Sequence, residues 1–369
     1  MAGIYLHIPF CKHKCTYCDF TSFPNRLNFA EAYMACLYKE IEMRGKELKD
    51  LTFDTVYFGG GTPSVIDAKF IYGAMKKIKQ CLNLSPDPEI TIEMNPGTVN
   101  EDKIATYKRA GINRFSIGLQ TAIDGQLENL GRIHNVRDYL YCTSLLKGEN
   151  FSTDIMLGLK GQTKEDVRKT VEIAAGSGAK HISMYALTPE DGTPVYSDYL
   201  NGELPDADEV AELYAYGYEL LKDKGYERYE VSNFAFSGFE SRHNLNYWRR
   251  GEYIGFGVSA SSFLFGRRFT NTLNLDEYIK CILSGFLPVI DNAPVDGEDA
   301  KFEFVMLALR TREGISALKY REAFGSDWKE DFADAYQKTS RYFEEDGDRT
   351  YLKDEYLYVQ NSILTQYMN

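Results

Sequence analysis

Between residues 4 and 225 the sequence alternates six times between a short apolar strand pattern and an amphipathic helix pattern. The predicted strands span residues 4–8, 53–58, 89–93, 114–119, 152–157 and 181–187. Strands that alternate with helices at this spacing form βαβ units, whose right-handed crossovers generate a parallel sheet. Six units suit an incomplete (β/α) barrel better than a doubly wound sheet, and no G-x-G-x-x-G follows the first strand. We therefore predict an α/β fold built on a partial (β/α)6-type parallel barrel.

The starts of five helices carry a shared signal, a polar residue followed three positions later by an acidic one. The side chain of the polar residue accepts a hydrogen bond from a free backbone amide of the first turn. The acidic side chain in turn accepts one from the backbone amide of the polar residue. The predicted pairs are Asn28 with Glu31, Ser64 with Asp67, Asn135 with Asp138, Thr163 with Asp166, and Asp206 with Glu209.

A loop after the first strand contains three of the seven cysteines, Cys11, Cys15 and Cys18, in a CxxxCxxC spacing. Structural zinc usually takes four ligands in two pairs, and the chain has no second pair. Three thiolates from one loop suit a cubane iron–sulfur cluster with one iron free to bind a small molecule. The basic residues 12–14 within the loop favour thiolate and offset the negative charge of a cluster. Three structural cysteines or a partial metal knuckle remain the alternatives.

Polar residues and glycines recur where the predicted strands end. In a parallel barrel these ends meet on the face where active sites are assembled. A run of three glycines permits close approach of the backbone to a ligand, and no Lys-Ser/Thr follows it, which excludes a P-loop. The residues in this position are Tyr5, Gly59, Gly60, Gly61, Glu93, Gln120, Asp154 and Ala186.

Several motifs together identify a family. They are YLHIPFC at residues 5–11, GGGTPS at 59–64, EMNP at 93–96, GLQ at 118–120, GRIH at 131–134, and Asp154. From residue 5 to at least residue 262, the chain resembles the coproporphyrinogen-dehydrogenase branch of the radical S-adenosylmethionine superfamily. The resemblance implies a [4Fe–4S] cluster on Cys11, Cys15 and Cys18, with S-adenosylmethionine on the open iron. It also implies cofactor contacts at Tyr5, Tyr17, Gly60, Gly61, Thr62, Glu93, Gln120, Arg132, Asp154 and Ala186.

Two features separate the groups within this branch. Only ten residues precede Cys11, and Phe20 stands where the dehydrogenases carry a further cysteine. Residues 243–248 read HNLNYW and match the HNxxYW motif of the HemW group of heme chaperones. This similarity implies that heme is bound near His243, Asn244, Tyr247 and Trp248 and passed to an acceptor hemoprotein. The motif does not identify His243 as the iron ligand, since a lone histidine and tryptophan are commonly structural.

Three other functions stay open at this stage. The first is oxygen-independent coproporphyrinogen III dehydrogenase activity by radical oxidative decarboxylation. The second is radical modification or degradation of heme, and the third is a structural zinc protein. Whether the protein is an enzyme is therefore left undecided.

Composition limits the partners. The 369 residues carry a net charge of −12, which argues against binding nucleic acid or an anionic membrane. No apolar run is long enough to span a membrane, and the first ten residues lack the basic start of a signal peptide. An odd number of cysteines without a disulfide framework indicates the cytoplasm. The acceptor, whether it is membrane-associated, and the existence of a homodimer are not determined.

We expect three regions along the chain. Residues 1–200 form the partial barrel, 201–290 extend it and carry the HNxxYW motif, and 295–369 form a C-terminal, mainly helical domain. Residues 188–205 are predicted to be a loop over the barrel mouth, and 291–297 a linker. The predicted C-terminal helices at 298–309, 316–324 and 328–345, with a hairpin around 353–355, resemble a winged helix. Its 10 basic against 16 acidic residues argue against DNA binding.

Overall fold

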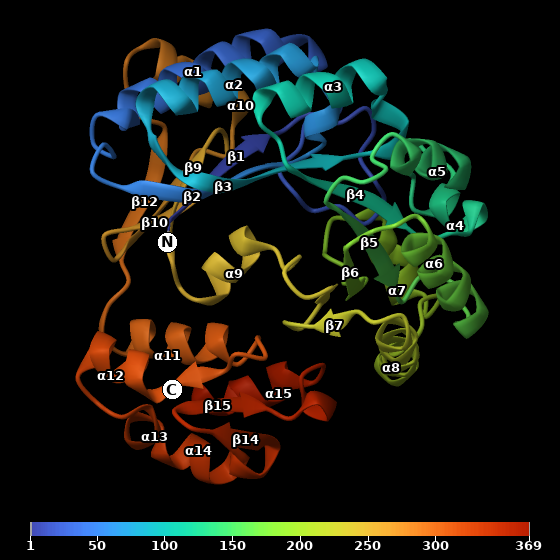
Figure 1. Ribbon diagram of the computed structural model, residues 1–369, viewed down its shortest axis with the longest axis vertical. Helices are drawn as coiled ribbons and strands as arrows, with labels where there is room; N and C mark the ends of the chain where they lie inside the picture. Colours follow the sequence, from blue (N-terminus) through green and yellow to red (C-terminus); the bar gives the residue numbers. More distant parts are fainter. Residues whose placement is uncertain (1, 369) are drawn as a thin grey trace.

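The computed structural model describes residues 2–368 and is organised around six parallel strands that neighbour one another in chain order (Figure 1). They are β1 (Ala2–Ile8), β2 (Thr52–Gly60), β3 (Asn83–Met94), β4 (Arg114–Gln120), β5 (Phe151–Leu157) and β6 (His181–Ala186). The sheet curves but does not close, because further strands are added at both edges. The predicted partial parallel barrel is confirmed.

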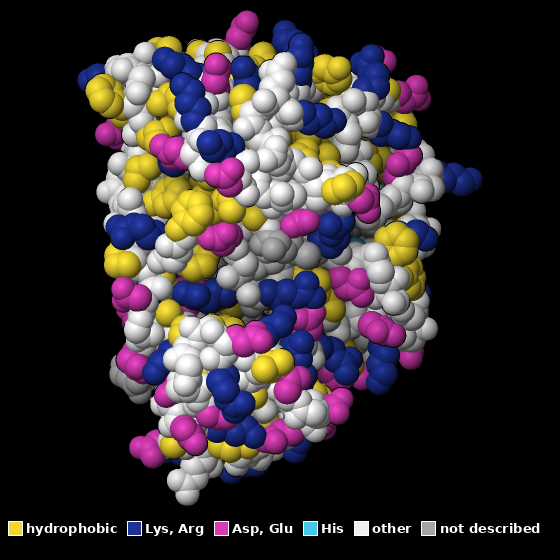
Figure 2. Space-filling model, turned by 60° about the vertical axis from the view of Figure 1, so that its left-hand side comes forward, with side chains coloured by type: hydrophobic (Ala, Val, Ile, Leu, Met, Phe, Trp, Pro, Cys, Tyr) yellow, Lys and Arg dark blue, Asp and Glu magenta, His cyan; other side chains and the backbone are white. Residues whose placement is uncertain are grey.

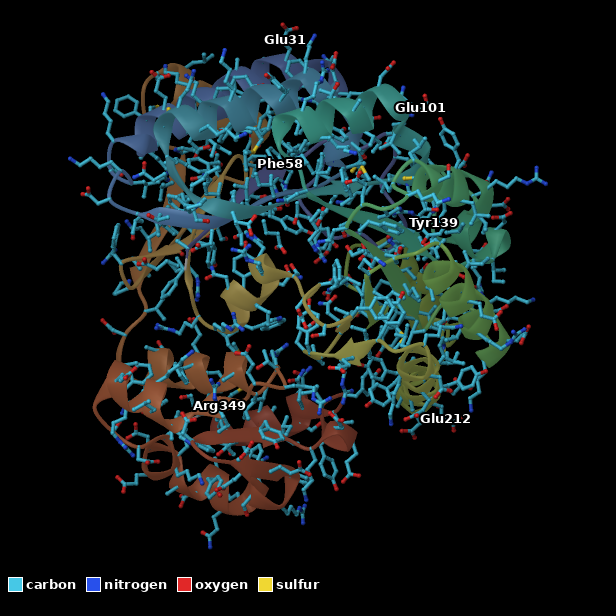
Figure 3. The ribbon with its side chains drawn as sticks, viewed as in Figure 1. Glu31, Phe58, Glu101, Tyr139, Glu212 and Arg349 are labelled. Atoms are coloured by element: carbon cyan, nitrogen blue, oxygen red, sulfur yellow. The ribbon has the colours of Figure 1, made fainter. Side chains whose placement is uncertain are left out.

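Helices cover the convex face of this sheet (Figure 1). They are α1 (Ala30–Gly45), α2 (Ala68–Cys81), α3 (Glu101–Ala110), α4 (Asp124–Asn129), α5 (Val136–Ser144), α6 (Lys164–Gly176) and α8 (Ala207–Asp223). Phe58 of β2 is fully buried between sheet and helices, whereas Glu31 and Glu101 lie on the outer surface (Figure 3). Burial of these apolar helix faces against the strands is the main source of stability for such a layer.

Three of the five predicted helix starts are confirmed, with capping boxes at Asn135, Thr163 and Asp206. The other two are wrong. A 3₁₀ turn, Leu27–Phe29, leads into α1 and places Phe29 at the cap position, so Asn28 does not cap the helix. Asp67 caps α2 by accepting from the Lys69 amide. The Ser64 hydroxyl instead bonds to the Thr98 hydroxyl and accepts from the Asn95 amide, which ties two strand ends together.

Additional strands extend the sheet beyond β1. β9 (Glu252–Phe256) pairs with β1 in parallel, and β10 (Ser261–Leu264), β11 (Arg267–Asn271) and β12 (Val289–Pro294) follow antiparallel. Residues 252–264 therefore return to the barrel edge as two strands. The predicted linker at 291–297 is wrong at its start, because β12 hydrogen-bonds along β11. At the other edge, β8 (Asn233–Ala235) and β7 (Glu227–Arg228) follow β6.

A buried carboxylate joins this extension to α1. Glu40 is fully buried and accepts from the Gly257 amide at 2.8 Å, the Asn271 side chain at 2.8 Å and the Tyr278 hydroxyl at 2.7 Å. Tyr278 lies on α10 (Leu275–Leu283). These bonds fix the added strands against the first helix.

The edge formed by α10 and β12 also carries exposed apolar side chains. Leu283, Phe286 and Ile290 are each more than half exposed. Figure 2 brings this side of the molecule forward and shows hydrophobic side chains gathered at the level of the sheet. Within residues 2–368 no helix combines the length and apolar character needed to cross a membrane.

Two short helices, α7 (Pro194–Leu200) and α9 (Arg242–Trp248), flank α8 in the chain after β6. The loop predicted at 188–205 is wrong in part, because the short helix α7 lies within it. α9 lies on the concave side of the sheet (Figure 1). It contacts β1, β2 and β9 and thereby fills the space that a closed barrel would enclose.

The C-terminal region has its own apolar core and a three-stranded sheet. It contains α11 (Gly297–Ala308), β13 (Ile315–Ser316), α12 (Ala317–Phe324), α13 (Trp328–Asp331), α14 (Ala333–Thr339), β14 (Phe343–Asp346), β15 (Arg349–Leu352) and α15 (Gln360–Leu364). The single helix predicted at 328–345 is wrong, because it breaks at Phe332 and its last residues form β14. The hairpin turns at Gly347 rather than around 353–355, since β14 pairs with β15.

The C-terminal region is fastened to β7 and the loop after it. The Val231 amide donates to the Arg310 carbonyl at 3.0 Å, and Glu230 forms an isolated β-bridge with Thr311. Arg228 donates to the backbone and side chain of Asp354. Residues 228–231 of the barrel extension are therefore hydrogen-bonded to the C-terminal region.

Candidate functional site

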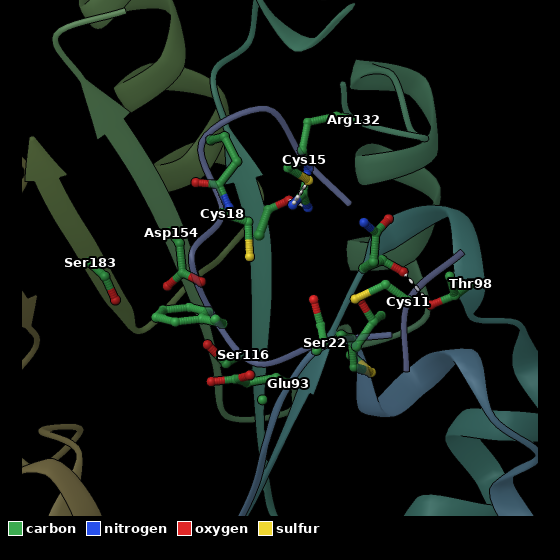
Figure 4. A pocket seen from close by; sticks show the side chains of 18 of the residues that line it. Cys11, Cys15, Cys18, Ser22, Glu93, Thr98, Ser116, Arg132, Asp154 and Ser183 are labelled. Carbon is green, nitrogen blue, oxygen red and sulfur yellow. Dashed lines mark hydrogen bonds between the residues drawn. The ribbon is translucent and has the colours of Figure 1, made fainter. Parts of the chain in front are cut away.

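The three cysteines of the first loop face one cavity of about 370 Å³, which extends from the carboxyl ends of the strands to the first residues of β4 and β6 (Figure 4). Cys11 is buried, and Cys15 and Cys18 are partly exposed. The loop is held at both ends by backbone bonds, from the Phe23 amide to the Pro9 carbonyl at 2.7 Å and from the Thr16 amide to the Leu130 carbonyl at 3.1 Å. Pro9 ends the pairing of β1 and turns the chain towards the cavity.

The chemistry of this donor set fits a cluster. Burial raises the pKa of the Cys11 and Cys18 thiols, so a positive group is needed to hold them as thiolates. Within residues 2–368 no three His, Cys, Asp or Glu side chains are close enough to hold one metal ion. A cubane accommodates a wider spread of sulfur atoms, because each thiolate binds a different iron.

The glycine run closes one wall of the cavity. Gly60 has φ of +111°, a conformation that favours glycine. A Cβ atom on Gly61 would lie 2.8 Å from the Phe10 carbonyl oxygen and 3.0 Å from Cys11 Sγ. The Gly61 amide donates to the Ile8 carbonyl and the Thr62 amide donates to the Phe10 carbonyl. These bonds hold the glycine run against the start of the cysteine loop. Only a residue without a side chain leaves room for the loop here.

Arg132 brings the cysteine loop and β4 together. Its guanidinium donates to Cys15 Sγ at 3.6 Å, to the Tyr17 hydroxyl at 3.3 Å and to the Gly118 carbonyl at 3.2 Å. Its Nε is buried and has no partner among the described residues. A guanidinium with a free donor in a cavity suits a carboxylate.

Two carboxyl groups lie across the cavity from the cysteines (Figure 4). Glu93 accepts from the Tyr57 hydroxyl at 2.9 Å, and burial raises its pKa to about 7. Burial likewise raises the pKa of Asp154 to about 6. Gln120 lines the same wall and accepts from the Tyr185 hydroxyl at 3.1 Å. Such acceptors suit ribose hydroxyls and an ammonium group, so the lining fits a nucleoside bearing an amino acid.

Comparisons with known proteins agree with this geometry. Residues 5–174 match the family model of the radical SAM superfamily, and residues 295–355 match the HemN C-terminal domain. The chain is 34% identical to the heme chaperone HemW of Bacillus subtilis over 333 residues, 88% of this chain and 87% of that protein. It is 32% identical to that of Lactococcus lactis over 371 residues, 99% and 96% of the two chains. The chain belongs to the HemW family.

The solved structures support the same fold. The coproporphyrinogen III oxidase HemN of Escherichia coli, a radical SAM enzyme, superposes with a TM-score of 0.87 over 99% of this chain and 89% of its own. Its sequence is only 18% identical, so this likeness concerns the fold alone. The HemW family therefore shares its architecture with HemN.

In this member of the HemW family, the HNxxYW motif forms most of α9. His243 is almost fully buried and uses both ring nitrogens, Nδ1 with the Thr55 hydroxyl at 2.7 Å and Nε2 with the Tyr247 hydroxyl at 2.8 Å. Asn244 lines the cavity of the cysteines. Trp248 lies apart, in a small hollow facing α11 of the C-terminal region, with the Arg310 guanidinium 5.8 Å from its ring. The four predicted heme residues therefore do not line one common pocket: Asn244 lines the cysteine cavity, His243 and Tyr247 bond to each other, and Trp248 faces α11.

The structure brings most, though not all, of the predicted cofactor residues to the cavity. Tyr17, Gly60, Gly61, Thr62, Glu93, Gln120, Arg132 and Asp154 line it with the three cysteines. Tyr5 lies behind this lining, where it bonds His7 Nδ1 at 3.0 Å and stacks on Tyr57. Ala186 ends β6 and pairs with Leu157 outside the lining. The roles of all these residues stay predictions.

Some lining residues were not predicted from the sequence. They are Tyr57, Arg114, Ser116, Ser152, His181, Ser183 and Tyr185, among others. Each lies on a parallel strand, and Tyr57 and Ser152 stand two positions before the predicted residues Gly59 and Asp154. Side chains two apart on a strand share a face. That alternation of polar residues within otherwise apolar strands was the signal available in the sequence.

Proposed function

We propose that this protein is a heme chaperone that holds a [4Fe–4S] cluster with S-adenosylmethionine and passes heme to an acceptor hemoprotein. The observation that carries the proposal is the position of α9. The helix with the HNxxYW motif packs inside the barrel, and its Asn244 lines the cavity that the three cysteines face. Relatives with heme-chaperone names over most of the chain support the same function.

The residues have separate tasks in this proposal. Cys11, Cys15 and Cys18 would hold three irons of the cluster. When bound, the cluster supplies an electron to the molecule on its open iron. Arg132 would pair with the methionine carboxylate through its free Nε, and Glu93 and Asp154 would accept from ammonium or ribose groups. Burial of these groups strengthens each contact because water is largely excluded.

Heme would bind beside this cavity. Coordination by His243 requires that its Nε2 exchange the Tyr247 hydroxyl for iron, or that Nδ1 release Thr55. Phe20, which replaces the further cysteine of the dehydrogenases, is 65% exposed and lines the cavity mouth. A location in the cytoplasm belongs to the proposal, and the acceptor is defined only as a hemoprotein.

An anaerobic binding experiment tests the proposal. The cluster is reconstituted and its absorbance recorded, and heme and coproporphyrinogen III are offered separately with S-adenosylmethionine and a reductant. We expect stoichiometric binding of intact heme, transfer of that heme to an apo-hemoprotein with a distinct Soret band, and unchanged coproporphyrinogen. Decarboxylated product would make this a dehydrogenase, and loss of the heme spectrum with cofactor consumption would make it a heme-modifying enzyme.

Matched cysteine variants separate the cluster from the fold. Cys15→Ala should lose the cluster absorbance, whereas Cys281→Ala on α10 should keep it, because Cys281 lies outside the cavity. A colourless wild-type protein that holds zinc would contradict the proposal. Equal cluster content in both variants would contradict the assignment of the ligands.

A further inference from the structure

Arg114 is a buried cation that no described carboxylate contacts directly. It is the first residue of β4, is 2% exposed and lines the cavity. Its Nε makes no hydrogen bond among residues 2–368. Asp154 of the same cavity lies within electrostatic range, since Arg114 opposes the rise in its pKa. A buried charge without a counter-charge destabilises a protein, so such groups are usually paired. This one is exposed only to the cavity.

His181 adds a second donor at the same end. It is the first residue of β6, is 1% exposed, and lines the cavity with a partnerless Nδ1. The Tyr229 hydroxyl accepts from the Ser241 amide at 3.2 Å and lies 2.8 Å from His181 Nε2. The Tyr229 hydroxyl therefore donates its proton to Nε2 of His181, and the proton of the neutral ring lies on Nδ1. Burial and the nearby Arg114 lower the pKa of His181 well below its usual value, so the ring is a neutral donor.

These donors lie at the opposite end of β4 from Gln120, and Glu93 and Asp154 lie between the two ends. Arg114 and Gln120 stand at opposite ends of β4, roughly 20 Å apart along an extended strand. Ser116 and Ser152 pair across β4 and β5, and Ser152 pairs with His181 on β6, so hydroxyl groups surround this end of the cavity. Ser152 donates to Ser116 at 3.1 Å. Glu89, the acidic residue near this end, is already occupied by two α9 amides.

We propose that Arg114 and His181 bind the carboxylate of a second ligand, distinct from the carboxylate assigned to Arg132. A planar guanidinium with a flanking N–H and hydroxyls is suited to a carboxylate. The source is either a propionate arm of the heme cargo or a free small carboxylic acid. The first source rests on the proposed function, and Asn244 of the HNxxYW helix lines the same cavity.

Heme and its dimethyl ester distinguish the sources, since the ester lacks both carboxylates. Affinities are measured on the reconstituted full-length protein with saturating S-adenosylmethionine, for wild type, Arg114→Met, Arg114→Lys and the exposed control Arg137→Met. We expect wild type and the control to bind heme at least tenfold more tightly than the ester. Arg114→Met should abolish this preference, and Arg114→Lys should retain part of it. An equal affinity of wild type for both, or an undiminished preference in Arg114→Met, overturns the heme-propionate assignment.

A second measurement remains informative when heme does not bind at all. Sodium propionate should then raise the melting temperature of wild type but not of Arg114→Met, which supports a free carboxylate as ligand although the proposed function has failed. No shift in either overturns the site.

Two controls decide whether Arg114 is merely structural. Without ligand, Arg114→Met should melt at or above the wild-type temperature, because a buried charge without a direct ion pair is removed. A clearly lower melting temperature overturns the proposal. A loss of S-adenosylmethionine affinity in equilibrium dialysis, without any change in the preference for heme over its ester, also overturns it.

Discussion

Replacement of Glu230 by glutamine should remove a pH dependence from the stability of the barrel at its junction with the C-terminal region. Glu230 is fully buried between β7 and β8, where its backbone bridges to Thr311. One carboxyl oxygen accepts from the Ser232 amide at 3.3 Å, and the other has no partner in the described chain. Burial raises the pKa of Glu230 to about 7, although the Ser232 amide, the nearby Asn233 and Arg310 oppose the rise.

The sign and size of the effect follow from this pKa. A carboxyl group whose pKa is higher in the folded than in the unfolded chain favours folding in its protonated form, so stability falls as the pH rises through about 7. A shift from 4.5 to about 7 corresponds to about 3 kcal/mol at most. Between about pH 5.5 and about pH 8.5, wild type should lose about 2 kcal/mol that the glutamine variant does not lose.

Urea unfolding of cofactor-free wild type and Glu230→Gln at both pH values measures this difference. Glutamine keeps the shape of the protonated acid and can accept from the Ser232 amide, so packing should be unchanged. The variant should be the more stable protein at the higher pH. A stability difference that is independent of pH, or a variant that is less stable at high pH, would refute the reasoning.

Two further variants test the site. Gly61→Ala should lower the cluster content at least twofold, because its Cβ meets the Phe10 carbonyl and Cys11 Sγ, whereas Gly125→Ala, with nothing within 4 Å, should not; equal absorbance in both would contradict the packing argument. Tyr247→Phe should raise heme affinity several-fold and alter the Soret band if iron binds His243 Nε2, because the competing hydrogen bond is lost; an unchanged spectrum would argue against that coordination.

The amino-acid sequence by itself determined the features that depend on neighbours in the chain. The alternation of strands and helices predicted the parallel sheet. Each element buries one face, so its apolar residues recur at the short period of a strand or a helix. The spacing of the three cysteines placed them in one loop, and the capping boxes at Asn135, Thr163 and Asp206 formed as expected. Local spacing was less reliable at residues 328–345, where pairing of β14 with β15 overrode a helical pattern.

Only the tertiary structure decided which side chains meet across long stretches of chain. Arg132 reaches Cys15 from 117 residues away, and His243 bonds Thr55 across 188 residues. Strand register decides which residues face the cavity, and for this reason Arg114 and His181 were not recognised from the sequence. In the sequence alone, a polar residue at the start of a strand does not differ from a common surface residue. Its burial without a direct ion pair becomes evident only when the strands are assembled, because desolvation depends on every element packed around it.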